Sequence, residues 1–117
     1  MNKCELGRKG EKEAKKYLEK LGYIIARQNF KCTYGEIDII AIDGNDIVFI
    51  EVKTRCSKKF GEARESVNTY KRKHIKKATA FFIYKYKLEN KYIRFDVIEV
   101  YKKSEKYVIN HIKNVLW

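Results

Sequence analysis

The sequence predicts an α/β domain of three layers, in which helices cover both faces of a mixed sheet. Two apolar runs, residues 37–42 and 47–52, flank a polar break at residues 43–46, and β-branched runs around a Gly-Asn centre are typical of a tight β-hairpin. The second run is apolar on both faces, as expected of a central strand that is covered on both sides. Helical patterns before and after the hairpin supply that cover. The predicted order is α-β-β-β-α-β, with room for an extra edge strand.

The first predicted element is a helix over residues 5–21. One stripe of its helical wheel holds only small or apolar residues, namely Gly7, Gly10, Ala14, Tyr17, Leu18 and Leu21. The small residues predict that this end of the helix approaches the sheet closely. Gly22 ends the helix, and a strand over residues 23–30 and a turn over residues 31–34 lead into the hairpin.

A polar loop over residues 55–65 follows the hairpin and leads to a long helix over residues 66–88. The apolar stripe of this helix consists of Val67, Tyr70, His74, Ala78, Phe81 and Phe82. Lys71 falls within the stripe, and an inward lysine requires an anion, either a carboxylate or a substrate phosphate. We interpret His74 as a stripe residue rather than a catalytic one, because no nucleophile partner is indicated for it.

A strand over residues 91–101 completes the predicted core. Because it follows a strand and a long helix, a right-handed parallel crossover is expected. Residues 107–112 are interpreted as a last edge strand within a C-terminal segment, 102–117, that lies outside the core of about residues 5–101. A chain of 117 residues is expected to form one domain with a sizeable core.

The charged residues of the hairpin are the main functional signal. If Gly44-Asn45 is a two-residue loop, Asp38 lies across from Glu51. The same register places Glu36 across from Lys53. Facing residues share one side of the sheet, as do residues two apart on a strand, so all four side chains are expected on one face. A slip of one residue would send the charges of the two strands to opposite faces.

Facing carboxylates repel each other, and a bound divalent cation would remove the conflict between Asp38 and Glu51. Hard cations such as Mg²⁺ bind carboxylate oxygens, and Lys53 beside them suits the neutralisation of a phosphate or the orientation of an attacking water. A second interpretation stays open, in which Glu36 and Lys53 form a surface salt bridge of little energetic value. Asp38 and Glu51 would then be exposed on a sheet edge.

Glu11 lies at the edge of the first helix's apolar stripe. Its position there makes it a candidate for a site beside the core. The alternative is that Glu11 is an acid favoured near a helix N-terminus by the helix dipole. The sequence leaves both interpretations open.

The net charge of +12 favours a polyanionic partner, with nucleic acid first. Lys71 and the outer residues of the long helix are candidate phosphate contacts, as is the basic loop; these residues are Arg72, Lys73 and Lys76, and Arg55, Lys58, Lys59 and Arg64. The alternatives are a solvated basic face and a lysine-rich proteome that makes many surfaces basic.

The chain is expected to be a cytoplasmic protein that does not enter the membrane. No apolar run approaches the length of a membrane span, and the first residues lack a signal peptide's apolar stretch. Cys4, Cys32 and Cys56 are odd in number and form no CxxC pair, so neither a disulfide framework nor a zinc site is indicated.

Asp38 and the triplet Glu51-Val52-Lys53, on adjacent strands behind a helix that bears Glu11, resemble the PD-(D/E)xK restriction-endonuclease-like superfamily. Within it, the chain resembles the YraN family, also called UPF0102. The residues that carry this resemblance are Gly7, Gly10-Glu11, Ala14, Leu18, Gly22, 35–41, 51–55, Phe60-Gly61, Lys71 and 94–97. The layout is also similar to that of archaeal Holliday junction resolvases.

The resemblance implies a restriction-endonuclease-like core and a site that uses Mg²⁺ or Mn²⁺. It implies Asp38 and Glu51 as metal ligands, together with the backbone carbonyl of Val52. It implies Lys53 as the residue that positions water or stabilises charge, and Glu11 as an auxiliary acid.

Two further residues complete the expected site, and one position departs from the superfamily pattern. Lys71 matches the lysine on the family's helix, and Glu36 is assigned a supporting role beside the metal ligands. Ile37 stands where the superfamily has the proline of its name, a replacement that many members tolerate.

Three functional hypotheses follow. The first is a metal-dependent nuclease that acts on DNA, with branched or single-stranded forms as candidate substrates. The second is a non-catalytic nucleic-acid-binding accessory protein that keeps the nuclease fold. The third is a partner-docking protein, homodimers included, whose tyrosines and Trp117 tail form a protein interface.

Overall fold

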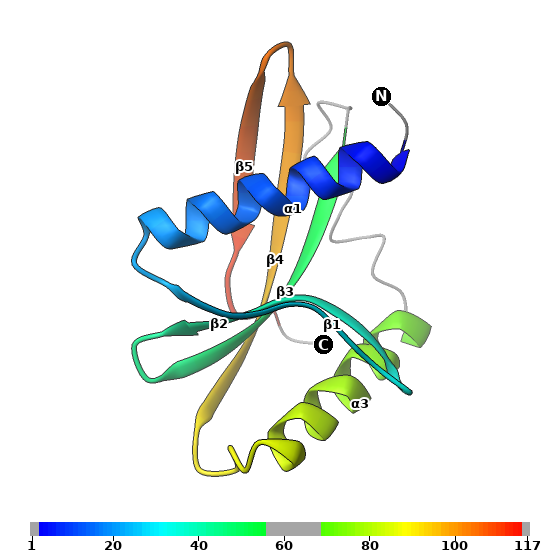
Figure 1. Cartoon of the computed structure of the whole chain (residues 1–117), viewed down its shortest axis with the longest axis vertical. Helices are drawn as coiled ribbons and strands as arrows, with labels where there is room; N and C mark the ends of the chain where they lie inside the picture. The colour runs from blue at the N-terminus through cyan, green and yellow to red at the C-terminus, as the bar shows by residue number, and fades with distance from the viewer. Residues whose placement is uncertain (1–2, 56–68, 116–117) are drawn as a thin grey trace.

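The computed structural model describes residues 3–55 and 69–115 (Figure 1). Its elements are α1 (Lys3–Lys20), β1 (Ile24–Cys32), β2 (Gly35–Asp43), β3 (Asp46–Arg55), α3 (Thr69–Lys85), β4 (Tyr92–Lys103) and β5 (Lys106–Ile112). This order confirms the predicted one, including the extra edge strand. The hairpin strands are longer than predicted, and the predicted helix start at residues 66–68 lies outside the described residues.

The five strands form one mixed sheet in the order β1-β2-β3-β4-β5. β3 and β4 are parallel, and the other neighbouring strands are antiparallel. The parallel pairing confirms the expected crossover through the long helix. β3 occupies the centre of the sheet, and its residues 47–52 are all buried, as predicted from its two apolar faces.

The predicted hairpin register is confirmed at the turn. Asp43 pairs with Asp46 and Ile39 pairs with Ile50 across β2 and β3. Gly44 has a φ of +61°, a conformation that glycine adopts without steric cost at the first position of a two-residue hairpin turn. The β2–β3 pairing ends at Ile39 and Ile50, before the charged residues are reached.

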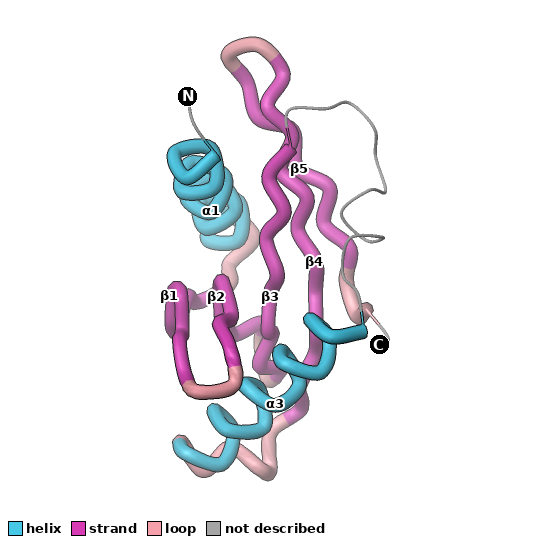
Figure 2. The backbone as a smooth tube through the Cα atoms, turned by 90° about the vertical axis from the view of Figure 1, so that its right-hand side faces the viewer, coloured by secondary structure: helices cyan, strands magenta, loops and turns pink. Residues whose placement is uncertain are grey.

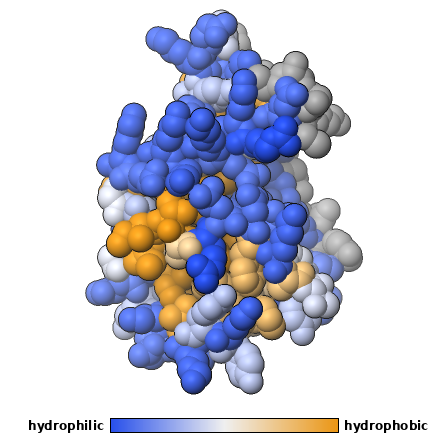
Figure 3. All heavy atoms as spheres, viewed as in Figure 1, coloured by the Kyte–Doolittle hydropathy of each residue, from blue (hydrophilic) through white to orange (hydrophobic). Residues whose placement is uncertain are grey.

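The two helices cover opposite faces of the sheet, giving helix, sheet and helix layers (Figures 1 and 2). Under α1, Ala14 and Leu18 pack with Val48, Ile50 and further apolar residues of the sheet. Under α3, the apolar cluster consists of Ile37, Ile40, Ile47, Phe49, Ala78 and Phe82. The surface over α1 is mostly hydrophilic, and an apolar patch lies below this helix in the same view (Figure 3).

The buried stripe of α3 is rotated from the predicted one. Ala78 and Phe82 are buried as expected, but Ile75 and Thr79 are buried too, whereas His74 and Phe81 are only half-buried. The predicted stripe was wrong at these positions, because an ideal helical wheel does not fix which side of a broad apolar arc meets the sheet. Val67 lies outside the described residues.

A second polar network, away from the charged residues of the hairpin, ties the strands together. Asp96 is fully buried and accepts hydrogen bonds from Arg94 Nε at 3.0 Å and Nη2 at 3.1 Å. His111 Nε2 lies 2.7 Å from Asp96, and Arg94 Nη1 reaches Asp43 at 3.0 Å. These partners satisfy the buried carboxylate. Because they come from β4 and β5, and Arg94 also reaches the hairpin turn, the network holds these three parts of the sheet together.

The absence of a spanning helix agrees with the sequence for the described ranges. No helix within residues 3–55 and 69–115 is long and apolar enough to cross a membrane. Cys32 carries a free thiol, and Cys56 lies outside the described residues.

The close approach of α1 to β3 gives a test with a built-in control. A Cβ at Gly10 would lie 1.8 Å from Thr54 Oγ1, whereas a Cβ at Gly7 meets no atom within 4 Å. We expect Gly7→Ala to raise the free energy of unfolding by about 0.5–1 kcal/mol through helix propensity. We expect Gly10→Ala to lower it by about 1–3 kcal/mol, because the helix must move away from β3. Urea unfolding measures both, and equal effects of the two substitutions would contradict this packing.

Candidate functional site

The candidate site begins where β2 and β3 separate. Beyond the Ile39–Ile50 pair the two strands no longer exchange backbone hydrogen bonds, and β2 runs off in another direction (Figure 1). Asp38 Oδ2 accepts a hydrogen bond from the Val52 backbone N–H at 2.8 Å. A carboxylate thus takes the place of a strand partner, because a buried N–H group must be satisfied.

β2 is bent at this point. Ile37 packs in the apolar cluster under α3, and Ile39 packs in the cluster under α1. Residues two apart on a regular strand face the same side, so the strand changes direction at Asp38. The bend places the Asp38 carboxyl beside the gap between the strands, between the layer of α1 and the layer of α3.

Glu51 lies on the α3 side of the gap and is paired with two lysines. Lys53 Nζ lies 3.3 Å from Glu51 Oε1, and Lys71 Nζ of α3 forms an ion pair with the same oxygen. Glu51 is only 7% exposed, and an unpaired carboxylate at that burial would be strongly unfavourable. The inward Lys71 predicted from the helix therefore meets its anion, a carboxylate of the hairpin.

Glu11 and Glu36 lie together on the α1 side of the gap. With its amide oriented to donate, Asn29 Nδ2 lies 2.8 Å from Glu11 Oε1 and 3.0 Å from Glu36 Oε1. Asn29 has a φ of +52°, a left-handed conformation in which asparagine is enriched among non-glycine residues. Asn29 was not among the residues expected at the site; its only signal in the sequence was a pair of polar amides, Gln28 and Asn29, within a predicted strand.

Two expectations from the hairpin need correction. The four charged side chains do not share one face, because the bend at Asp38 and the strand separation place Glu36 near α1 and Glu51 near α3. The surface interpretation is also wrong, since Lys53 pairs with the buried Glu51 rather than with Glu36. The charges instead meet from both sides of one gap.

Burial and neighbouring charge raise the pKa values of two acids of this gap, Asp38 and Glu11. Burial, and then the charge of Glu51, raise the pKa of Asp38 to about 8, although the Val52 N–H opposes the rise. Burial raises the pKa of Glu11, with the charges of Glu36 and Glu51 adding to it and the Asn29 hydrogen bond opposing it. The raised pKa values of Asp38 and Glu11 thus follow first from burial and then from the acids beside them.

The pKa values of the two lysines shift in opposite directions. Burial lowers the pKa of Lys53, and its hydrogen bond with Lys71 and that lysine's charge lower it further, against the attraction of Glu51. Burial also acts to lower the pKa of Lys71, but the hydrogen bond and charge of Glu51 outweigh it and raise that pKa. Lys71 is therefore the more firmly charged of the two, and Lys53 the more readily deprotonated.

A pocket of about 450 Å³ opens beside the gap, between the start of α1 and the end of β3. It is lined by Leu6, Gly7, Glu11, Val52, Lys53, Thr54 and Arg55. Arg55, which the sequence placed in a loop, is the last residue of β3. Four of the expected site residues, Glu11, Val52, Lys53 and Arg55, thus line one open space of substrate size.

The donor set for a metal ion is a small one. Within residues 3–55 and 69–115, no three acidic, histidine or cysteine side chains form a group that could hold a metal ion. The expected set asks for only two carboxylates, from Asp38 and Glu51, and the Val52 carbonyl. These are hard oxygen donors that suit Mg²⁺, which commonly completes its shell with water and substrate oxygens. A cation there would also relieve the repulsion that raises the pKa of Asp38.

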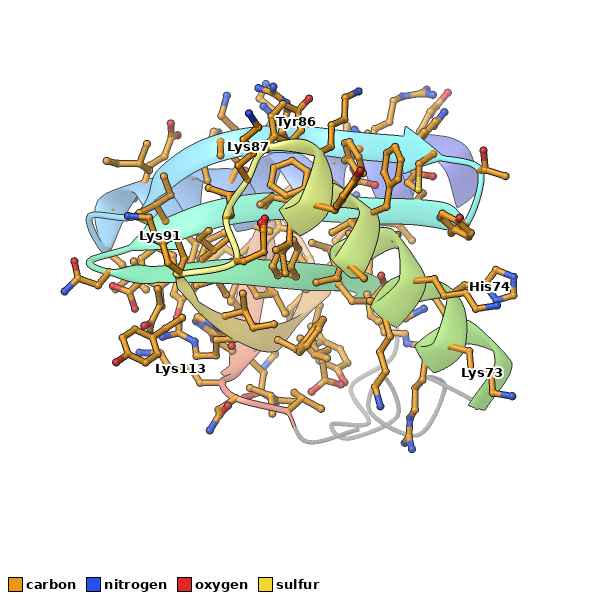
Figure 4. The ribbon with its side chains drawn as sticks, turned by 90° about the horizontal axis from the view of Figure 1, so that it is seen from below. Lys73, His74, Tyr86, Lys87, Lys91 and Lys113 are labelled. Carbon is orange, nitrogen blue, oxygen red and sulfur yellow. The ribbon has the colours of Figure 1, made fainter. Side chains whose placement is uncertain are left out.

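The remaining basic residues of α3 differ in exposure. Arg72 is half-buried on α3, and Lys73 and Lys76 are exposed on the same helix. Figure 4 places Lys73 and His74 at one end of α3 and Tyr86 beyond its other end. The basic loop residues Lys58, Lys59 and Arg64 lie outside the described residues, as does Trp117.

Comparisons with known proteins agree on one family. A family model described as "Uncharacterised protein family UPF0102" matches residues 10–100. A UPF0102 protein of Caldicellulosiruptor saccharolyticus is 50% identical over 116 residues, covering 97% of this chain and 98% of its own. A UPF0102 protein of Thermodesulfovibrio yellowstonii is 47% identical over 117 residues and all of both chains. One of Caldanaerobacter subterraneus is 44% identical over 116 residues, covering 99% of this chain and 95% of its own.

The raised pKa of Asp38 predicts an unusual pH dependence of stability in the absence of divalent cations. Between the ordinary pKa of 3.8 and the folded value of about 8, the folded chain holds a proton that the unfolded chain has lost, so stability falls as pH rises through this window. Asp38→Asn keeps an acceptor for the Val52 N–H and removes the charge. We expect this variant to exceed the wild type in Tm by about 5 °C or more at pH 9, and by much less at pH 4.

Thermal unfolding in EDTA at both values of pH measures this difference. Glu89→Gln, which removes an exposed charge in the turn before β4, is the control for net charge. A Tm difference between Asp38→Asn and wild type that does not change with pH would contradict the assignment.

Proposed function

The chain belongs to the UPF0102 family, and we propose that it is a nuclease that hydrolyses DNA phosphodiester bonds with Mg²⁺ or Mn²⁺. We include in this proposal the restriction-endonuclease-like arrangement of its core. The observation that carries it is the meeting of Asp38, Glu51 and Lys53 where β2 and β3 separate, beside an open pocket. Charged groups are gathered in a central strand region only where something uses or neutralises them.

Each residue of the gap has a role that its surroundings support. Asp38, Glu51 and the Val52 carbonyl would hold the cation, which when bound would polarise a phosphoryl oxygen and activate a water. Lys53 lies on Glu51 and lines the pocket, where its ammonium can stabilise charge or orient water. Glu11 lines the same pocket, and its raised pKa means that it holds a proton more firmly than a free carboxyl does, as suits a general acid.

Lys71 adds positive charge from α3. It shares Glu51 Oε1 with Lys53, so a substrate phosphate that approaches Glu51 meets two ammonium groups. The net charge of +12 attracts a polyanion over a longer range. Both effects favour binding of nucleic acid over binding of a neutral substrate.

A second candidate function rests on the same ion pairs. Because two lysines already neutralise Glu51, the folded chain has no electrostatic need for a cation at that carboxylate. A non-catalytic module that binds nucleic acid would keep such an arrangement. It predicts binding that weakens with rising salt and that is indifferent to divalent cations.

The nuclease proposal is tested with labelled duplex, single-stranded and branched DNA, each incubated with Mg²⁺ and with Mn²⁺. We expect metal-dependent cleavage by the wild type and by the control Glu89→Gln. We expect Glu51→Gln to lose activity by about 100-fold or more, because a direct ligand should cost at least as much as the groups that support one. Absence of cleavage of every substrate, by protein that is folded and binds DNA, would overturn the proposal in favour of the binding module.

A further inference from the structure

A shallow groove of about 590 Å³ runs along the side of α3 that faces away from the sheet, and aromatic rings line it. We call it the α3 groove; its lining residues are Tyr34, Lys77, Ala80, Phe81 and Tyr84. Tyr34 comes from the turn between β1 and β2, and the other four come from α3. None of the residues used to hold the candidate metal ion lines this groove.

The rings of the α3 groove are exposed without serving the core. Tyr84 is 79% exposed and Tyr34 is 43% exposed, while Ile75, Ala78 and Phe82 already fill the sheet side of the helix. Two of the rings, Tyr34 and Phe81, also pack against each other. The Phe81 ring centroid lies 6.1 Å from that of Tyr34 and 6.4 Å from that of Phe30.

Positive charge accompanies the rings. The segment from Thr69 to Lys85 contains six lysine or arginine residues and no acid. Lys73, Lys77, Phe81 and Tyr84 follow one another at spacings of four, four and three residues, so they lie along one face of the helix. Lys85 Nζ lies 5.9 Å from the Phe81 ring centroid. Like charges four residues apart destabilise a helix, and a bound anion would remove that cost.

We propose that the α3 groove binds single-stranded nucleic acid, with bases stacked on Tyr34 and Tyr84 and phosphates against Lys73 and Lys77. Stacking platforms inside a positively charged groove are the common means of holding an unpaired strand, because every base presents a π-face. A duplex keeps its bases stacked inside, so it offers the lysines its phosphates but offers the tyrosines nothing. The interleaving of rings with lysines therefore selects the single strand.

The groove and the candidate site lie on one helix. Tyr84 and Lys71 are 13 residues apart along α3, or about 20 Å along the helix axis. Lys71 lies on the side that faces the sheet, where it pairs with Glu51, so a strand would cross from one side of the helix to the other over this distance. At the ~3.4 Å rise of a stacked strand, this distance corresponds to about six nucleotides. The inference rests on the proposed nuclease function only in its consequence, that a strand held in the groove is led toward the gap at Asp38.

The test measures binding in EDTA, so that cleavage plays no part. Fluorescence anisotropy with a labelled oligothymidine of about 15 nucleotides reports the Kd of each variant. We expect Tyr84→Ala and Tyr34→Ala each to weaken binding by about 5- to 100-fold, the range expected for the loss of one stacked base. We expect Tyr84→Phe to stay within about twofold of wild type, because the ring that stacks is retained.

Tyr92→Ala is the matched control, since Tyr92 is 76% exposed on β4 and does not line the groove. It should leave the Kd unchanged. Lys77→Ala should reduce the slope of log K against log salt by about one unit. A blunt duplex of the same length should bind without sensitivity to Tyr84→Ala.

Four results would overturn the inference: unchanged binding of both oligothymidine and oligouridine in the two tyrosine-to-alanine variants, an equal loss in Tyr84→Phe and Tyr84→Ala, an equal loss in Tyr92→Ala, or an equal loss on the duplex. The same series with oligouridine identifies the sugar. A loss with DNA, with RNA or with both supports the groove, and a loss with neither overturns it. The nuclease assay decides separately on catalysis, because the anisotropy measurement in EDTA reports binding without cleavage.

Discussion

One hydrogen bond, from the Val52 N–H to the Asp38 carboxyl, lets the centre of the sheet open without leaving a backbone group unsatisfied. A continuous β2–β3 ladder would fill the place where the charged residues meet. With Asp38 in that position, β2 can bend away while β3 continues alongside β4 up to Arg55. The buried N–H has its acceptor. As a consequence, the Asp38 carboxyl is held near other acids and is partly shielded from solvent. The raised pKa of Asp38 follows from the opening of the sheet.

The helices bring charged side chains to this opening from opposite sides. α1 brings Glu11 beside Glu36, with the Asn29 amide between them, and α3 brings Lys71 to Glu51. A buried carboxylate is tolerated when it is paired, so Glu51 depends on the position of α3 as much as on its own strand. α1 depends on Gly10, whose missing side chain lets the helix approach Thr54. The two helices are thus part of the site as well as its cover.

Most of the fold was predictable because strand and turn chemistry are local. The Gly44-Asn45 turn fixed the register of the hairpin, and β-branched runs marked β2 and β3. The two-faced apolar pattern of β3 correctly indicated a central strand. Lys71 was predicted to need an anion because it interrupts an apolar stripe, and the structure supplies Glu51. These inferences succeeded where neighbouring residues determine the outcome.

The rest depended on departures from regular structure. Alternation along a strand predicts a shared face only if the strand is straight, and β2 is bent at Asp38. The stripe of α3 was misplaced because helical periodicity gives an arc and not its exact contact with the sheet. Asn29 adopts a left-handed conformation within β1, which no pattern of apolar residues signals. The catalytic and binding roles of the site residues stay predictions. They concern chemistry, which the arrangement of the chain supports but does not test.

The charges of the two helices differ in a way that gives the molecule two unlike faces. α1 carries Glu5, Glu11, Glu13 and Glu19 among its basic residues, and its Lys16 pairs with Glu13 at 3.3 Å. α3 has no acid within Thr69–Lys85, so its outward lysines have no carboxylate of their own helix to pair with. Like charges on one helix repel each other, and the polyanion proposed to bind along α3 would offset this repulsion. Since the same helix carries Lys71 to Glu51, a polyanion bound along α3 would reach the gap between β2 and β3 at one end.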